Sequence, residues 1–223
     1  MKLSESTINV LKNFATINAG MQFKEGSVVR TISKGQNVLG KATVTENFEK
    51  DFVIYDLNRF LSLCSSLTDP EIVINTDANN LTVKSGTSKT TYGLADESMI
   101  VAPPAKELKI ENSEVNFRLT KDDMNQVLKL SGILGLPNIA VIGDGASISI
   151  ATLDVKNDES DNFSIKVGET TSNFKMIFNT ENLKMVPGNY DVAISSKGIS
   201  HFKHVTDQIE YWIATEAGSK YEG

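Results

Sequence analysis

One pattern recurs four times along this chain: a capping residue, a short amphipathic helix and then alternating strands. Residues 174–196 are its fullest example. Phe174, Met176 and Phe178 alternate as in a strand, and Thr180 is placed to cap a helix. Pro187 then stops that helix, and a further strand begins at Tyr190. The cap positions, separated by 52, 64 and 60 residues, are Ser4, Asp56, Thr120 and Thr180.

The other three copies contain recognisable start and stop signals. Thr120 with Asp123 forms a capping box, and Pro137 ends the helix that it starts. Asp144-Gly145 separates two alternating runs and suits a type I′ hairpin turn. Any chain of alternating helices and strands shows some rhythm of this kind. The pattern nevertheless predicts four helix-plus-sheet units, two to a domain.

These units predict an α+β protein of two similar domains. The segment MIVAPPAKELKIENSE contains Pro103-Pro104, which suits neither a helix nor a central strand, and its second half is polar. We therefore expect a first domain over residues 1–102, a connector over 103–113 and a second domain over 114–223. A chain of 223 residues is long enough for two modest cores.

Charge and composition limit the classes of function. The net charge is −6, and residues 112–223 account for most of it, with 10 basic and 15 acidic side chains. This balance argues against a protein that grips nucleic acid by a basic surface, but not against one that encloses it. With no long apolar run and no signal peptide, the chain is expected in the cytoplasm. The lone Cys64 is expected in the core.

The residues for common catalytic and cofactor sites are missing. There is no phosphate-binding loop, dinucleotide fingerprint or nucleophile elbow. His201 and His204 point to opposite faces of a strand, so no metal site is expected. The carboxylate pairs Asp122-Asp123 and Asp158-Glu159 fall at a helix start and in a loop, where solvated acids are common. We expect no enzyme activity, no catalytic residues, no metal and no cofactor.

Four stretches carry a family likeness: VLKNFATINAG (10–20), IYDLNRFL (54–61), IVAP (100–103) and LKMVPGNY (183–190). Their order and spread resemble the sliding clamp of T-even-type bacteriophages, the processivity factor of DNA replication. The resemblance implies a homotrimeric ring of DNA-clamp domains, each with antiparallel sheets outside and two helices inside. It also implies duplex DNA in the ring, a tethered DNA polymerase, an ATP-driven clamp loader and participation in late transcription within the host cell.

The predicted polar helix faces each carry a basic residue. Any solvated helix face has this composition, so the faces alone favour no function. With the resemblance, the expected DNA-facing set is Lys12, Arg59, Lys121, Lys129 and Lys184. The alternative is a β-rich viral structural or interaction protein whose helix faces are simply solvated.

The resemblance also implies where subunits and partners meet. The strand near residues 87–95, with Thr91 and Tyr92, would pair with the neighbour's strand at 163–167, with Phe163, Ile165 and Val167. Apolar partner tails would enter a pocket rimmed by Val101, Pro103 and Leu108, although Val101 could equally be interior.

Overall fold

The computed structural model describes residues 1–157 and 159–223, so Asp158 of the expected solvated pair lies outside the described residues. The chain divides into two compact units, Met1–Lys106 and Glu107–Gly223. The change of unit falls inside the segment 103–113 that was assigned to a connector. Within the described part, no helix is long and apolar enough to cross a membrane.

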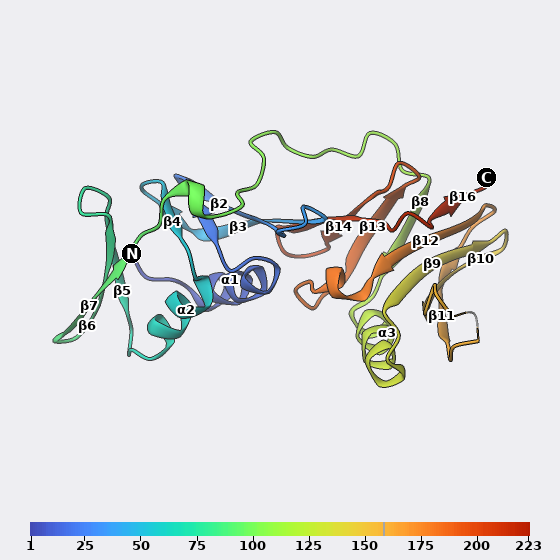
Figure 1. Cartoon of the computed structure of the whole chain (residues 1–223), viewed down its shortest axis with the longest axis horizontal. Helices are drawn as coiled ribbons and strands as arrows, with labels where there is room; N and C mark the ends of the chain where they lie inside the picture. Colours follow the sequence, from blue (N-terminus) through green and yellow to red (C-terminus); the bar gives the residue numbers. More distant parts are fainter. Residues whose placement is uncertain (158) are drawn as a thin grey trace. The chain divides into compact units, whose positions relative to one another are not determined.

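The first unit combines two helices with two antiparallel sheets (Figure 1). Its helices are α1 (Glu5–Ile17) and α2 (Leu57–Ser65). One sheet has the order β4-β1-β2-β3, from β1 (Met21–Phe23), β2 (Gly26–Ile32), β3 (Val38–Phe48) and β4 (Phe52–Ile54). The other has the order β5-β6-β7, from β5 (Glu71–Asn75), β6 (Asn80–Ser85) and β7 (Ser88–Gly93). A 3-10 turn, η1 (Glu97–Met99), follows.

The second unit repeats this plan around α3 (Lys121–Leu134). A five-stranded sheet has the order β11-β10-β9-β12-β16, from β9 (Asn138–Asp144), β10 (Ser147–Leu153), β11 (Phe163–Glu169), β12 (Asn173–Asn179) and β16 (Lys220–Tyr221). A second sheet has the order β15-β14-β13-β8, from β8 (Val115–Leu119), β13 (Tyr190–Ser195), β14 (Ile199–His204) and β15 (Ile209–Ala214). All recorded pairings in both units are antiparallel, for example β8 with β13 and β1 with β4.

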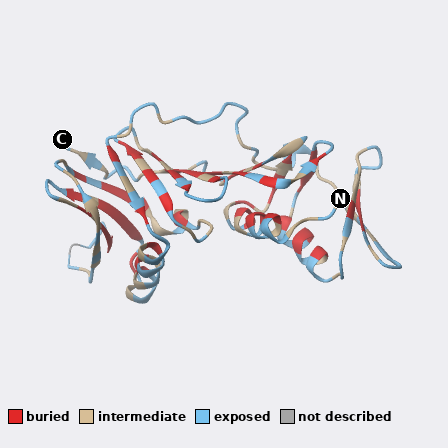
Figure 2. Cartoon of the chain, turned by 180° about the vertical axis from the view of Figure 1, so that it is seen from behind, coloured by how far each residue is buried: buried red, intermediate tan, exposed pale blue. Residues whose placement is uncertain are grey.

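The helices turn their apolar stripes towards the sheets (Figure 2). Leu11, Phe14, Leu57 and Val127 have no solvent exposure, and Cys64 is buried as expected. Burial raises the pKa of the Cys64 thiol to about 11, which keeps it protonated and unreactive. Gly40 on β3 allows α1 to approach closely, because a Cβ there would lie 2.9 Å from the Phe14 ring.

Three of the four expected caps are confirmed. The side chains of Ser4, Asp56 and Thr120 accept hydrogen bonds from the backbone N–H three residues later. In the capping box the Thr120 hydroxyl also contacts the Asp123 carboxylate at 2.6 Å. The helix α3 ends at Gly135, which has a positive φ of 65°, two residues before Pro137.

The fourth expected helix is wrong in detail. It is a single 3-10 turn, η2 (Thr180–Leu183), capped by Asn179 through the Glu181 N–H at 2.9 Å. Thr180 is the first residue of the turn, and its hydroxyl lies 3.3 Å from the Ser131 hydroxyl of α3. Its N–H donates to the Pro137 carbonyl and so extends the pairing of β12 with β9. Beyond the turn, the hydroxyl groups of Tyr190 and Tyr211 bond the Val186 backbone, which holds the chain extended up to Pro187.

The Asp144-Gly145 hairpin exists, but its turn is not type I′. That type needs positive φ at both central residues, and only Gly145, at 80°, has it. Asp144 instead accepts hydrogen bonds from the N–H groups of Ala146 and Ser147, at 3.0 and 2.7 Å. These two hydrogen bonds to the Asp144 side chain stabilise the turn, which lacks the second positive φ of a type I′ turn.

Each chain terminus covers one edge of a sheet. In the first unit, Met1 exchanges two backbone hydrogen bonds of 2.7 Å with Ile72 on β5. In the second, β16 pairs with β12 through Phe174 with Tyr221 and Lys175 with Lys220. The opposite edges of these two sheets are β7 and β11.

Candidate nucleic-acid interface

The solvent-facing sides of the three helices carry four of the five expected basic residues. Lys12 lies on α1, Arg59 on α2, and Lys121 and Lys129 on α3, and all four are exposed. Each sits opposite a buried stripe, because residues three or four positions apart share a helix face. Their positions within each helix follow the sequence prediction.

Lys184 is placed differently. It lies just after η2 and not on a helix, and its ammonium group pairs with the Glu181 carboxylate. The pairing offsets its charge, so Lys184 offers less positive potential than the other four residues.

The charge on the helices differs from that of the whole chain. Helices α1, α2 and α3 together carry four basic and three acidic residues, a net charge of +1 against −6 for the chain. Their aromatic residues, Phe14 and Phe60, are buried and cannot stack on bases. Scattered ammonium and guanidinium groups without base-reading side chains suit weak, sequence-independent contacts with phosphates.

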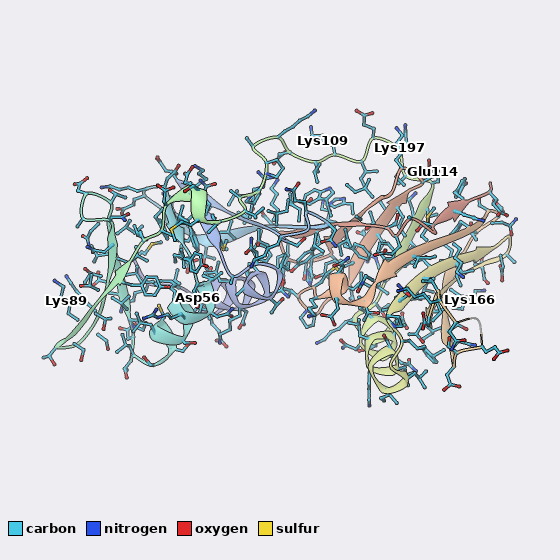
Figure 3. All side chains as sticks on the ribbon, viewed as in Figure 1. Asp56, Lys89, Lys109, Glu114, Lys166 and Lys197 are labelled. Carbon is cyan, nitrogen blue, oxygen red and sulfur yellow. The ribbon has the colours of Figure 1, made fainter. Side chains whose placement is uncertain are left out.

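The residues expected at subunit contacts lie on two edge strands, β7 and β11. Thr91 and Tyr92 belong to β7, and Phe163, Ile165 and Val167 alternate along β11 with half-buried side chains. Lys89 on β7 and Lys166 on β11 mark these strands in Figure 3, and both are exposed. Among the described residues, each of these strands has a paired strand on one side only, and its open side lies beside partly covered apolar side chains. This combination favours pairing with another strand.

Tyr92 also fastens the β7 edge to α2. Its hydroxyl donates to the Asp56 carbonyl at 2.9 Å, and its ring packs edge-on against Phe60. Burial, with a smaller contribution from the Asp56 carboxylate, raises the pKa of Tyr92 and keeps the hydroxyl a donor.

Of the expected partner-pocket residues, Pro103 lines a pocket. The pocket has a volume of about 490 Å³, lies within the first unit and is also lined by Gln22, Lys24, Glu25, Val28, Arg30, Glu97 and Ala105. Val101 is half-buried and its carbonyl accepts from the Asn18 side chain at 3.2 Å. Leu108 is 38% exposed and belongs to the second unit.

Sequence reasoning missed Lys24, Val28 and Arg30 in this pocket. Strand alternation supplied part of the signal, because Val28 and Arg30 flank the buried Val29 on β2. No pattern supplied the path of residues 97–105, of which Glu97, Pro103 and Ala105 line the pocket.

The histidines are engaged in local contacts. His201 Nε2 lies 2.8 Å from the Glu210 carboxylate and its ring stacks on Trp212. The Nδ1 of His204, which is buried, accepts from the Asp207 N–H at 3.0 Å. Within the described residues, no group of three or more histidine, cysteine or acidic side chains is arranged to hold a metal ion.

Two family models match adjoining parts of the chain. Residues 2–102 match the DNA polymerase processivity factor family, and residues 116–217 match the family described as gp45 sliding clamp, C terminal. A sliding clamp of Vibrio phage KVP40 is 35% identical, with 97% of this chain and all of that protein covered. The chain belongs to the sliding-clamp family of processivity factors.

Other relatives and solved structures agree with this assignment. Sliding clamps of Escherichia phage RB69 and Enterobacteria phage T4 are 31% and 29% identical over the full length of both chains. The Proliferating Cellular Nuclear Antigen of Entamoeba histolytica aligns with a TM-score of 0.68 at 15% identity, covering 94% of each chain. The PCNA of A. fulgidus, solved with the C-terminal region of FEN-1 bound, aligns with a TM-score of 0.69 at 14% identity, covering 98% of each. The fold is therefore that of the DNA clamps, as the sequence predicted.

Proposed function

We propose that this clamp forms a homotrimeric ring around duplex DNA and tethers the replicative DNA polymerase. The observation that carries the proposal is full-length membership of the sliding-clamp family, together with exposed basic residues on α1, α2 and α3 of an otherwise acidic chain. In this arrangement the ring is retained on DNA by topology. A surface that bound many phosphates tightly would instead resist movement.

The proposed bore is lined by Lys12, Arg59, Lys121, Lys129 and Lys184. One or two cations per helix give contacts that break easily at each step along the duplex. The acidic remainder of the surface disfavours DNA elsewhere. Lys184, paired with Glu181, contributes least.

The proposed subunit contact joins β7 of one subunit to β11 of the next. Thr91 and Tyr92 then meet Phe163, Ile165 and Val167 of the neighbour, and both uncovered edges are satisfied. Such heterologous contacts must close into a ring to avoid open polymers. The PCNA2-PCNA3 complex of Sulfolobus tokodaii, a fold neighbour with a TM-score of 0.61 at 13% identity, is a precedent for association between subunits of this fold.

The proposed partners act on the ring from outside. An ATP-driven loader opens and closes it, the polymerase is tethered to it, and late transcription factors use it as a mobile activator in the cytoplasm of the host cell. The clamp itself catalyses nothing. The FEN-1 segment bound to A. fulgidus PCNA supports recruitment through peptide tails, for which Val101, Pro103 and Leu108 are the proposed contacts.

The decisive experiment separates encirclement from adhesion. Clamp is loaded on nicked circular DNA with a phage clamp loader and ATP, and the complex is isolated by gel filtration. We expect it to remain on the circle and to run off after a single cut linearises the DNA. Equal retention on both forms would contradict encirclement. A monomeric mass by light scattering under loading conditions would favour the alternative of a viral structural protein.

A further inference from the structure

Residues 97–105 cross the face of the β4-β1-β2-β3 sheet that points away from α1 and α2 (Figure 1). We call this segment the strap. Side chains from the sheet and from the C-terminal end of α1 hold the strap by hydrogen bonds and an ion pair. The ties are Gln22 to Glu97, Lys24 to Glu97 at 3.5 Å, Asn18 to the Val101 carbonyl at 3.2 Å, and Arg30 to the Pro104 carbonyl at 2.8 Å.

The tie made by Arg30 leaves the guanidinium incompletely bonded. Its Nη1 donates to the Pro104 carbonyl. Its Nε is buried and has no hydrogen-bond partner among the residues that the structure describes. A buried donor without an acceptor is costly, and native structures rarely leave one without a reason. The group is therefore suited to an additional acceptor.

The pocket beside Arg30 has an apolar wall and a charged rim. Val28, which is 40% exposed, lies with Pro103 and Ala105 on the apolar side. Lys24 and Arg30 supply two positive charges, and Glu25 and Glu97 supply two negative ones. Glu97 is already engaged by Gln22 and Lys24. A rim without net charge gives no general attraction for a polyanion such as nucleic acid, so a single carboxylate would be held by Arg30 itself.

The planar fork of an arginine matches a carboxylate through two parallel N–H···O bonds. In Arg30 the edge formed by Nε and the second terminal nitrogen offers that geometry. A carbonyl, such as that of Pro104, accepts at one point only. The Pro104 carbonyl takes Nη1, so a carboxylate can pair with the other edge without competing with it.

We propose that this pocket binds an acidic side chain of a partner peptide, with a neighbouring apolar side chain on Val28 and Pro103. The carboxylate takes both donors of the edge formed by Nε and the second terminal nitrogen, while Nη1 keeps its hydrogen bond to the Pro104 carbonyl, so one side chain holds both the peptide and the strap. This proposal rests on the proposed function, because recruitment of partners is what the site would serve.

The test uses the intact protein and two capped tripeptides, acetyl-Leu-Asp-Leu-amide and its isostere acetyl-Leu-Asn-Leu-amide. The readout is the NMR signal of the Arg30 Nε–H group, assigned by its loss in Arg30→Lys. We expect the Asp peptide to shift this signal in a saturable way and the Asn peptide to bind at least about tenfold more weakly, since it cannot form the charged bidentate pair. Amide signals of residues 101–105 should shift together with it.

Arg118→Lys is the matched control, because Arg118 is an exposed arginine already paired with Asp191 at 2.7 Å. It should leave peptide binding unchanged, whereas Arg30→Lys should abolish the preference for Asp over Asn. Equal responses to both peptides, or no movement of the Arg30 signal at millimolar peptide, would overturn the proposal. Retention on circular DNA is measured on the same samples, so a failed clamp and a failed pocket are told apart.

Discussion

At the scale of single residues, Glu46 on β3 joins the first helix to the first sheet. Its carboxylate accepts hydrogen bonds from the Ser4 N–H and the Thr7 hydroxyl. Partial burial raises the pKa of Glu46, but the bonds from Thr7 and Ser4 outweigh that effect, so the pKa lies below its ordinary value of 4.5. The ionised form therefore stabilises the fold.

Glu46→Gln should lower the free energy of unfolding by about 1.5 kcal/mol at pH 7, because a charged acceptor is lost. A depressed pKa contributes stability that is present above pH 4.5 and disappears as the pH falls through the folded value. The difference between wild type and variant should thus shrink as the pH falls below 4.5. Urea unfolding at several pH values measures it, with the exposed Glu49→Gln as the neutral control; a difference independent of pH would argue against this role.

Gly188 and Gly132 give opposite predictions for the same substitution. A Cβ at Gly188 would lie 1.8 Å from His204 Nε2, inside a buried cluster, whereas a Cβ at Gly132 on α3 would meet nothing within 4 Å. Gly188→Ala should cost about 3 kcal/mol through overpacking. Gly132→Ala should add about 0.5–1 kcal/mol, because alanine favours a helix. Thermal unfolding of both variants decides, and similar shifts in the two would refute the packing argument.

At the scale of elements, the sequence predicted those features that depend on residues close together in the chain, such as helix caps. Ser4, Asp56 and Thr120 were found as caps because their side chains bond a neighbouring backbone N–H. Thr180 failed because its hydroxyl lies against that of Ser131 on α3, at 3.3 Å, a contact across 49 residues of sequence. The strap and Arg30 were missed for the same reason, since they meet only after the sheet has formed.

The exposed helix faces carry the prediction for DNA contact. Lys12→Glu combined with Lys129→Glu should reduce polymerase processivity several-fold, because two phosphate contacts per subunit become repulsive. The trimer should survive, since neither residue lies on β7 or β11. Lys34→Glu with Lys220→Glu, exposed and off the helices, is the control of equal charge. Primer extension on a long template compares them, and equal processivity of all forms would remove Lys12 and Lys129 from the lining.

At the scale of the whole molecule, β7 and β11 are edge strands that pair on one side only among the residues that the structure describes. On β11, Ile165 lies on the half-buried side and Ser164 on the exposed side. The two residues are neighbours in sequence and face opposite ways.

Ile165→Glu should therefore break the subunit contact by placing a charge among apolar side chains, raising the dissociation constant at least about tenfold. Ser164→Glu adds the same charge on the solvated face and should leave the trimer intact. Sedimentation of both variants across a concentration series gives the answer, with circular dichroism to verify that each subunit is folded. An intact Ile165→Glu trimer would move the contact away from this strand.

The hydrogen bonds of Met1 to β5 and of β16 to β12 have a consequence for how copies can join. These bonds occupy the β5 and β12 sides of the two sheets, so another strand can be added only at the opposite edges, β7 and β11. An assembly that grows through these edges is therefore polar, with a different strand at each end. A protein tag on either end of the chain would accordingly lie beside β5 or β12 and leave β7 and β11 available for contact.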